Sequence, residues 1–252
     1  MYRILSTNVL CWGNEEHSIE KRIPLEIEMI KRLKPDSFGV QEAHIDWMKP
    51  LTAALPEYGW VGVGREDGKE DGEFEAVFYL KEKFTASDSG HFWISETPDV
   101  PSKSWDSACT RMATYVKLTD KVTGNSYVHI NTHLDHIGRV AQVNGARMIA
   151  EKAASFGGLP VVATGDFNVT PDSDCYATMI SSNMGDARTL APDSDSSFTF
   201  HWFDPEKYHD IIDYIFVDKA TVAPVRFRVF NEKINGSFYS DHYAVYADIE
   251  LK

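Results

Sequence analysis

The chain has 252 residues, of which 43% are hydrophobic and 12% aromatic, so it can bury a large core and is not intrinsically disordered. Its net charge of −13 argues against a protein that grips long nucleic acid through a broad basic face, and it allows a small substrate or an acidic site filled by divalent cations. Cys11, Cys109 and Cys175 are odd in number and share no metal-ligand spacing, which predicts buried free thiols rather than a disulfide framework.

The sequence carries no targeting or membrane-spanning signal that we can identify. No apolar run reaches the length of a transmembrane segment, and the start MYRILSTNVL lacks the pattern of a signal peptide. We therefore expect a cytoplasmic chain, or a secreted or periplasmic one whose leader has been trimmed. We find no internal repeat, low-complexity tract or linker, so we predict one domain over residues 1–252 and a monomer.

The first third of the chain is predicted to alternate between strands and helices. Residues 2–10 alternate in polarity and indicate a strand, and residues 19–33 repeat apolar side chains at helical spacing, with Pro24 tolerable in the first turn. A second helix is expected over residues 44–55, interrupted at Pro50. Short strands are predicted at residues 37–40, 58–64 and 74–80, with a charged, glycine-rich loop at residues 65–73.

The rest of the chain is richer in strands. Residues 84–94 indicate a strand pair or one long bent strand, and residues 95–108 form a long loop of the kind that often walls a binding site. A hairpin turning through residues 123–125 is expected to join strands at 111–118 and 127–132. Helices are predicted at residues 139–154 and 175–182, and short strands at 197–200, 211–217, 222–230 and 243–251.

A polar pair follows a short apolar strand at residues 160–163. Gly165 ends this strand, and Asp166 and Asn168 come directly after it. A carboxylate can take a proton from water or hold a cation, and an amide can hold that water or a phosphate oxygen. The simpler interpretation is an Asp/Asn turn that caps its own backbone. That interpretation loses ground because matching polar residues recur at other predicted strand ends.

Several further polar clusters follow or interrupt predicted strands. They are Thr7-Asn8, Gln41-Glu42, Asn131-Thr132-His133 with Asp135 and His136, Asp213 within IIDYIFV, and Ser240-Asp241-His242. Each has an ordinary explanation when taken alone: Glu42 could be a surface carboxylate, and His133 a buried histidine with its hydrogen bonds satisfied. Asp213 is harder to dismiss, because a carboxylate inside an apolar strand needs a partner.

Taken together and in this order, the motifs NTHLDH, GDFN, DYIFV and SDH resemble those of the endonuclease/exonuclease/phosphatase superfamily. The resemblance runs from Asn8 to His242, almost the whole chain, and the stretches GEFEAVFY and FWISETPDVPSKSW resemble a bacterial branch of it. It implies an α/β fold, a four-layer sandwich of two packed mixed β-sheets flanked by helices. It also implies a hydrolase for phosphoesters.

The resemblance assigns roles to individual residues. Glu42 matches the main metal-binding glutamate, with Asn8 beside the metal and Asp241 able to share it. Asp166 and Asn168 match the pair that orients or deprotonates the attacking water. The remaining roles fall on His242, oriented by Asp213; His133, a contact to the phosphate; Glu73, which could orient His133 although Glu75 lies close by; and Arg111 and Arg139, weaker candidates for phosphate clamps.

The expected chemistry is metal-assisted attack of water on phosphorus. Oxygen ligands, without a cysteine or three-histidine set, favour Mg²⁺ or Mn²⁺ over Zn²⁺. The main prediction is therefore a divalent-metal-dependent phosphoester hydrolase for a small or lipid-derived substrate. A nuclease, which should show a basic groove, and a catalytically silent binding module are the alternatives. A small-molecule enzyme should show a closed pocket walled by residues 95–108, and long duplex DNA should be a poor substrate.

Overall fold

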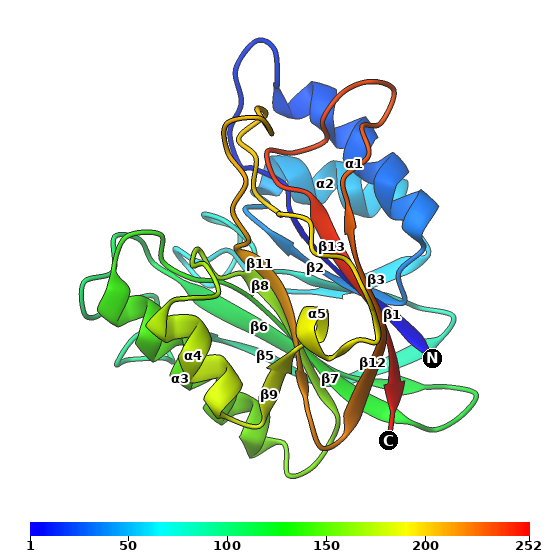
Figure 1. The fold of residues 1–252 in the computed structure, drawn as a ribbon, viewed down its shortest axis with the longest axis vertical. Helices are drawn as coiled ribbons and strands as arrows, with labels where there is room; N and C mark the ends of the chain where they lie inside the picture. Colours follow the sequence, from blue (N-terminus) through cyan, green and yellow to red (C-terminus); the bar gives the residue numbers. More distant parts are fainter.

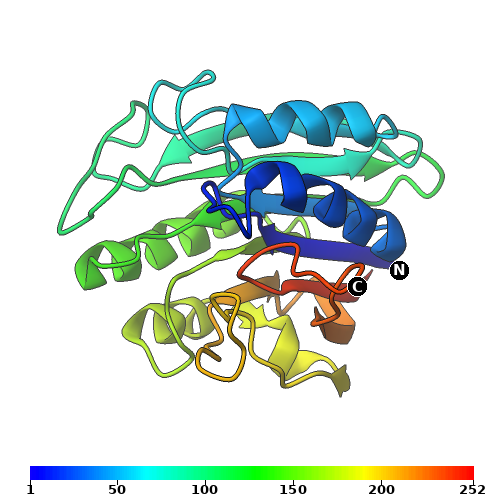
Figure 2. The ribbon, with the colours of Figure 1, turned by 90° about the horizontal axis from the view of Figure 1, so that it is seen from above.

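The computed structural model describes residues 1–252, and it places two mixed β-sheets face to face with helices on their outer sides (Figures 1 and 2). The expected α/β sandwich is therefore confirmed. One sheet has seven strands in the order β10-β12-β13-β1-β2-β4-β3, and the other has six in the order β5-β6-β7-β8-β11-β9. None of the helices is both long and apolar enough to cross a membrane.

The strands of the seven-stranded sheet are β1 (Tyr2–Asn8), β2 (Ser37–Gln41), β3 (Tyr58–Val61), β4 (Val77–Leu80), β10 (Asp193–Ser194), β12 (Val222–Phe230) and β13 (Ala244–Leu251). Those of the six-stranded sheet are β5 (Phe84–Trp93), β6 (Met112–Asp120), β7 (Ser126–His133), β8 (Val161–Asp166), β9 (Met184–Asp186) and β11 (Asp213–Asp218). The helices are α1 (Ile19–Leu33), α2 (Ile45–Ala54), α3 (Arg139–Ser155), α4 (Asp174–Ser181) and the short α5 (Ala187–Leu190).

The register of three strand pairs brings polar residues to one edge of the sandwich. Parallel β1 and β2 place Asn8 opposite Gln41, and parallel β7 and β8 place His133 opposite Asp166. Antiparallel β8 and β11 place Asp166 opposite Asp213. Because the carboxyl ends of parallel strands meet at one edge, residues that are far apart in sequence gather there.

Several predicted elements differ in the structure. Helix α2 is not interrupted at Pro50, and Pro24 lies beyond the first turn of α1. A proline removes only one backbone hydrogen bond, and both helices bury apolar side chains that offset this loss. Residues 84–94 form one strand with a bulge at Asp88 rather than a pair, and residues 197–200 form no strand but isolated bridges from Phe200 to Asp210 and His242.

The remaining differences are at boundaries and in short elements. The strands expected at residues 58–64 and 74–80 are shortened to β3 and β4, because Phe74 makes isolated bridges to Ala43 and Gly64 instead of joining a ladder. Strands β9 and β10 and helix α5 were not predicted, because they are too short to show a periodicity. All three cysteines are free, as predicted, although only Cys175 is fully buried.

A polar layer lies between the two sheets beneath the strand ends. His129 is fully buried, with Nδ1 2.8 Å from the Ser37 hydroxyl and Nε2 2.9 Å from the Thr164 hydroxyl. Asn131 accepts from the Gln41 amide (2.7 Å) and donates to backbone carbonyls of the facing sheet. A Cβ on Gly39 would lie 2.2 Å from the Asn131 Oδ1, so only glycine allows this close approach.

The buried His129 predicts an acid-sensitive stability. Burial lowers the pKa of His129 from 6.5 to about 3, so between these values the unfolded chain binds a proton that the folded chain does not. The free energy of unfolding should therefore decrease as the pH is lowered through this window. This group contributes a slope of up to about 1.4 kcal/mol per pH unit. Urea unfolding of wild type and His129→Gln should give stability curves that converge from pH 7 down to about pH 5. Parallel curves would contradict the prediction.

Candidate active site

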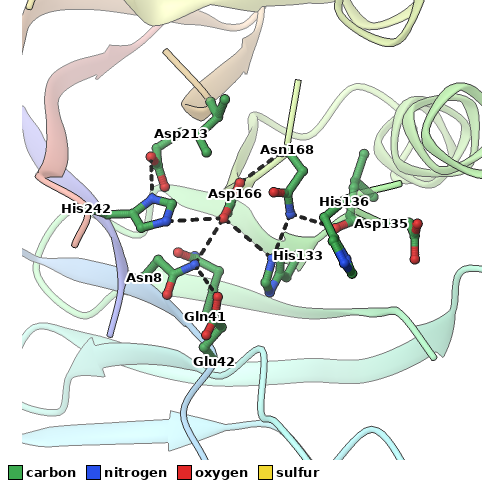
Figure 3. Close-up of polar contacts among 12 residues, drawn as sticks. Asn8, Gln41, Glu42, His133, Asp135, His136, Asp166, Asn168, Asp213 and His242 are labelled. Atoms are coloured by element: carbon green, nitrogen blue, oxygen red, sulfur yellow. Dashed lines mark hydrogen bonds and ion pairs between the residues drawn. The ribbon is translucent and has the colours of Figure 1, made fainter. Parts of the chain in front are cut away.

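The polar strand ends form the floor of a cleft of about 1330 Å³ (Figure 3). Of the residues predicted from the sequence, those that line the cleft are Glu42, Glu73, Arg111, His133, Arg139, Asp166, Asn168, Asp241 and His242. Asn8 and Asp213 lie directly behind this surface, hydrogen-bonded to Asp166 and His242 respectively. The structure therefore brings all the predicted site residues to one region of the molecule, although Arg139 lies at its exposed outer wall.

Asn8 links two carboxylates that come from opposite sheets. Its Nδ2 donates to Glu42 Oε1 (2.9 Å) and to Asp166 Oδ2 (3.0 Å), while its Oδ1 accepts from the Leu10 N–H (2.9 Å). Two carboxylate acceptors on one side fix the orientation of the amide. In this arrangement Asn8 holds the carboxylates in place through its nitrogen, and its oxygen is occupied by backbone.

Glu42 is held as an anion. Burial acts to raise the pKa of Glu42, but the charge of His133, the Cys11 N–H (3.0 Å) and the Asn8 amide outweigh this effect and lower it to about 2.

Two residues of the site have left-handed backbone. The φ of Glu42 is 61° and that of Asn168 is 53°. Left-handed backbone is uncommon for residues other than glycine and is concentrated at functional sites.

The ring of His133 lies between the carboxylates of Glu73 and Asp166. The Asn168 Nδ2 donates both to the Leu134 carbonyl (3.0 Å) and to His133 Nε2 (2.9 Å), so a neutral His133 carries its proton on Nδ1. Nδ1 lies 3.7 Å from Glu73 Oε2, and Nε2 lies 3.5 Å from Asp166 Oδ2. Glu73 is thus the carboxylate on the Nδ1 side of the ring.

Glu75 differs sharply from Glu73. It is fully buried, neither of its oxygens has a hydrogen-bond partner, and burial together with the charge of Glu73 raises its pKa well above 4.5. Burial thus disfavours the charged form of Glu75, whereas the pKa of Glu73 is lowered, and Glu73 is hydrogen-bonded to Arg65 Nη1 (2.5 Å) and 3.8 Å from Arg111 Nη1.

His242 and Asp213 form a close pair on the other side of Asp166. His242 Nδ1 lies 2.9 Å from Asp213 Oδ2, and its Nε2 lies 3.8 Å from Asp166 Oδ2. Burial alone would lower the pKa of His242, but the charges of Asp213, Asp241 and Asp166 raise it well above 6.5. Burial is the main effect on Asp166 and raises its pKa above 3.8. The charge of His133 opposes this shift, and the charge of Asp213 adds to it.

Asp241 stands apart from the Glu42–Asp166 cluster. It is buried and lines the cleft, and burial raises its pKa to about 6, with His242 opposing the shift. The ligand atoms of Glu42, His133 and Asp166 lie within 4.8 Å of one another, a spacing that Asp241 does not share. Asp241 therefore faces the cleft without contributing to this cluster.

The sequence motifs could not show which polar residues face the cleft and which bind backbone, and Asp135 and Arg111 are one example of each. Asp135 accepts backbone N–H groups from two separate segments, including those of Cys109 (3.0 Å) and Gly138 (2.7 Å), and these bonds outweigh burial to lower its pKa to about 2. It organises backbone rather than facing a substrate. Arg111 is buried at the cleft, and its Nε and Nη1 have no hydrogen-bond partner.

The loop at residues 95–108 does not wall the cleft, contrary to expectation. Its Asp106 instead caps α3 by accepting from the Ala141 N–H (2.8 Å). The walls come from α3, with Arg139 and Arg147, and from Trp12 and Trp202 on two other loops. The sequence analysis assigned no role to these tryptophans, nor to Arg65, because their positions depend on loop packing that leaves no periodic signal.

The donor set fits a hard divalent cation. Glu42 and Asp166 offer carboxylate oxygens and His133 offers a ring nitrogen, and one ligand atom of each lies within 4.8 Å of the others. Two carboxylates that share one neutral amide attract positive charge, so a bound divalent cation would stabilise the arrangement. The predominance of oxygen donors favours Mg²⁺ or Mn²⁺ over Zn²⁺.

Two mixed sheets packed face to face, with carboxylates and histidines gathered at one edge, define the class of this protein as an α/β sandwich with a polar site at its strand ends. Residues 26–242 match the endonuclease/exonuclease/phosphatase family, and the chain belongs to that family. The resemblance seen in the sequence motifs is therefore confirmed.

Solved structures of bacterial proteins share the whole architecture. An endonuclease/exonuclease/phosphatase protein from Bacteroides vulgatus is 36% identical with a TM-score of 0.94, and the alignment covers 100% of this chain and 99% of that one. A mannosyl-6-phosphatase from Bacteroides thetaiotaomicron is 32% identical with a TM-score of 0.91, covering 99% and 100%. The human nocturnin catalytic domain, at 20% identity with a TM-score of 0.79 and coverage of 100% and 94%, shares the fold.

A curated viral relative matches only in part. An uncharacterised protein of Acanthamoeba polyphaga mimivirus is 28% identical over 128 residues. The match covers 45% of this chain and 19% of the viral protein, so this chain corresponds to about a fifth of that relative's length.

Proposed function

We propose that this protein is a divalent-metal-dependent hydrolase that removes phosphate from a small phosphoester. The observation that carries the proposal is the convergence of Glu42, His133 and Asp166 beside the Asp213–His242 pair at the floor of a cleft. These groups provide a cation site, a carboxylate that can act on water and a buried cationic imidazole within one small region.

The chain's own residues divide the work of hydrolysis. Glu42 and Asp166, with His133, would hold Mg²⁺ or Mn²⁺, and Asp241 could contribute from across the cleft. The cation would neutralise charge that builds on the phosphoryl oxygens. Asp166, whose orientation is set by the Asn168 N–H (2.8 Å) and by Asn8, takes the proton of the attacking water. His242, kept cationic by Asp213, stabilises the charged transition state or protonates the leaving oxygen.

The charge of the cleft supports a small substrate over a nucleic acid. Its lining residues include seven carboxylates against four arginines: Glu42, Glu73, Asp166, Asp172, Asp174, Asp210 and Asp241, and Arg65, Arg111, Arg139 and Arg147. Such a surface is not the basic groove that a polyanion requires. The relative described as a mannosyl-6-phosphatase supports a hexose phosphate as the first substrate to test.

A substrate screen tests the proposal. The purified chain, treated with chelator and then supplied with Mg²⁺ or Mn²⁺, should release inorganic phosphate from hexose phosphates and other small phosphomonoesters. Bis-para-nitrophenyl phosphate, sphingomyelin, single-stranded nucleic acid and plasmid DNA complete the panel. Turnover that is unchanged after chelation, or efficient cleavage of plasmid DNA at physiological salt, would overturn the proposal.

Removal of the Glu42 carboxylate should weaken the response to metal. Glu42→Ala eliminates a negative charge at the cation site, so we expect the Mg²⁺ concentration for half-maximal activity to rise by roughly 10-fold or more. Activity titrated against free Mg²⁺ measures the change, and Glu57→Ala, an exposed carboxylate outside the cleft, is the matched control. An unchanged Mg²⁺ requirement in Glu42→Ala would remove Glu42 from the metal site.

A further inference from the structure

Two tryptophans that are distant in the sequence meet at the rim of the cleft. The ring centroids of Trp12 and Trp202 lie 5.6 Å apart, and their side chains remain 48% and 43% exposed. Trp12 lies in the loop after β1, and Trp202 lies in the long loop before β11 (Figure 1). A contiguous exposed aromatic patch in a cleft marks a surface that a ligand covers.

The backbone beneath Trp202 is held in an unusual conformation. Trp202 and Phe203 have φ values of 46° and 61°, in the left-handed region that bulky residues rarely adopt. The Trp202 N–H donates to the Asp241 carbonyl (3.2 Å), and the Phe203 N–H donates to His201 Nδ1 (3.1 Å). The loop is therefore hydrogen-bonded to Asp241, the residue before His242. Its left-handed backbone conformation holds the exposed Trp202 side chain in a fixed position.

Trp12 is held in place from below by a buried guanidinium. Arg22 is only 1% exposed and donates to the carbonyls of Leu10 (3.0 Å) and Trp12 (2.6 Å). The two loops are joined where the His17 ring stacks on Phe203, with centroids 3.8 Å apart and planes inclined by 3°. The tryptophan pair is thus preformed, which lowers the entropy cost of binding a ligand.

A third aromatic ring connects the pair to the candidate active site. The Phe200 ring lies 5.9 Å from that of Trp202 and 4.9 Å from that of His242. We define Trp12, Phe200 and Trp202 as the aromatic wall. The aromatic wall extends from the rim of the cleft to His242, which would face the leaving oxygen. It therefore adjoins the space where the leaving group must lie.

We propose that the aromatic wall binds the ring of a sugar leaving group, an inference that rests on the proposed function. A pyranose has an apolar C–H face that packs on aromatic rings and an edge of hydroxyls that hydrogen-bond to carboxylates. Asp210, an exposed carboxylate paired through backbone with Phe200, lies at this side of the cleft. The Trp12 and Trp202 planes are inclined by 59°, which suits a puckered ring rather than the flat slot of a nucleobase.

The test separates ring recognition from hydrolysis. Trp12→Ala, Trp202→Ala and the double variant are assayed with Mg²⁺ on mannose 6-phosphate and on glycerol phosphate, which has no ring. We expect kcat/KM for the hexose phosphate to fall by roughly 10-fold in each single variant, while that for glycerol phosphate changes less than about 3-fold. Trp60→Ala, which removes an exposed tryptophan (39%) outside the cleft, is the matched control and should leave both values unchanged.

Binding measured without turnover completes the experiment. Calorimetric titration of mannose 6-phosphate into Asp166→Asn, with and without the double tryptophan substitution, should show an affinity loss that matches the loss in kcat/KM. Equal losses for both substrates, or no loss for either, would reject the aromatic wall while leaving phosphatase activity intact. A larger tryptophan-dependent loss with a nucleoside monophosphate or with sphingomyelin vesicles would also overturn the sugar assignment. Absence of activity on every substrate would instead reject the proposed function.

Discussion

Asp166→Asn should lower kcat by roughly 10³-fold while the protein keeps its fold, because the substitution removes the base and preserves the shape of the side chain. The new amide oxygen can still accept from the Asn168 N–H, which lies 2.8 Å from Asp166 Oδ1. Its nitrogen would face the Asn8 amide, which retains Glu42 as an acceptor. The loss should therefore lie in the chemical step, measured as kcat at saturating substrate and Mg²⁺.

A buried carboxylate elsewhere provides the control for Asp166. Asp186, on β9, is 2% exposed and lies outside the cleft, so Asp186→Asn tests the general effect of neutralising a buried acid. We expect this control to change kcat by less than about 3-fold, with thermal unfolding reporting any loss of stability in either variant. If Asp166→Asn retained more than about a tenth of the wild-type kcat, Asp166 could not be the base.

His242 and Asp213 should behave as a unit, and this is the second large effect that we expect. His242→Ala should cost roughly 10²- to 10³-fold in kcat, and Asp213→Asn roughly 10- to 100-fold. The double variant should be no worse than His242→Ala within about 2-fold, because an aspartate that acts through the imidazole has nothing left to orient. A double-mutant cycle on kcat measures this coupling.

The pH dependence gives an independent test of the same pair. The cationic form of His242 exists below its pKa, which Asp213 and the neighbouring acids raise well above 6.5. Activity that needs the cation is therefore retained at neutral pH and lost as pH rises through that raised pKa. Asp213→Asn removes one of the charges that raise it, so the alkaline limit of the rate profile should move down toward neutrality. His91→Ala, at an exposed site on β5, should leave the limit in place, and additive losses with an unmoved alkaline limit would reject the pair.

The sequence by itself determined the elements whose signal is local. The apolar spacing of α1 and α3 and the apolar strand of β8 follow from periodicity, and the structure contains all three close to their predicted bounds. Because Asp166 is the last residue of β8 and Asn168 follows two residues later, their convergence with other strand-end residues was predictable from strand order and motif alone. A partner for Asp213 was predictable because a buried carboxylate requires one, but its identity as His242 was implied only by the resemblance to the family.

The tertiary structure alone decided which loops enclose the cleft. Residues 95–108 looked like a wall, yet they lie outside the cleft lining and their Asp106 caps the N-terminus of α3, and Trp12 and Trp202 line the cleft instead. The physical reason is that a loop's position depends on the elements it joins and on buried anchors such as Arg22, whose carbonyl partners are not visible in a one-dimensional pattern. The same holds for Glu73 and Glu75, two residues apart, where only packing determines that the pKa of Glu73 is lowered beside His133 and that the pKa of Glu75 is raised by burial.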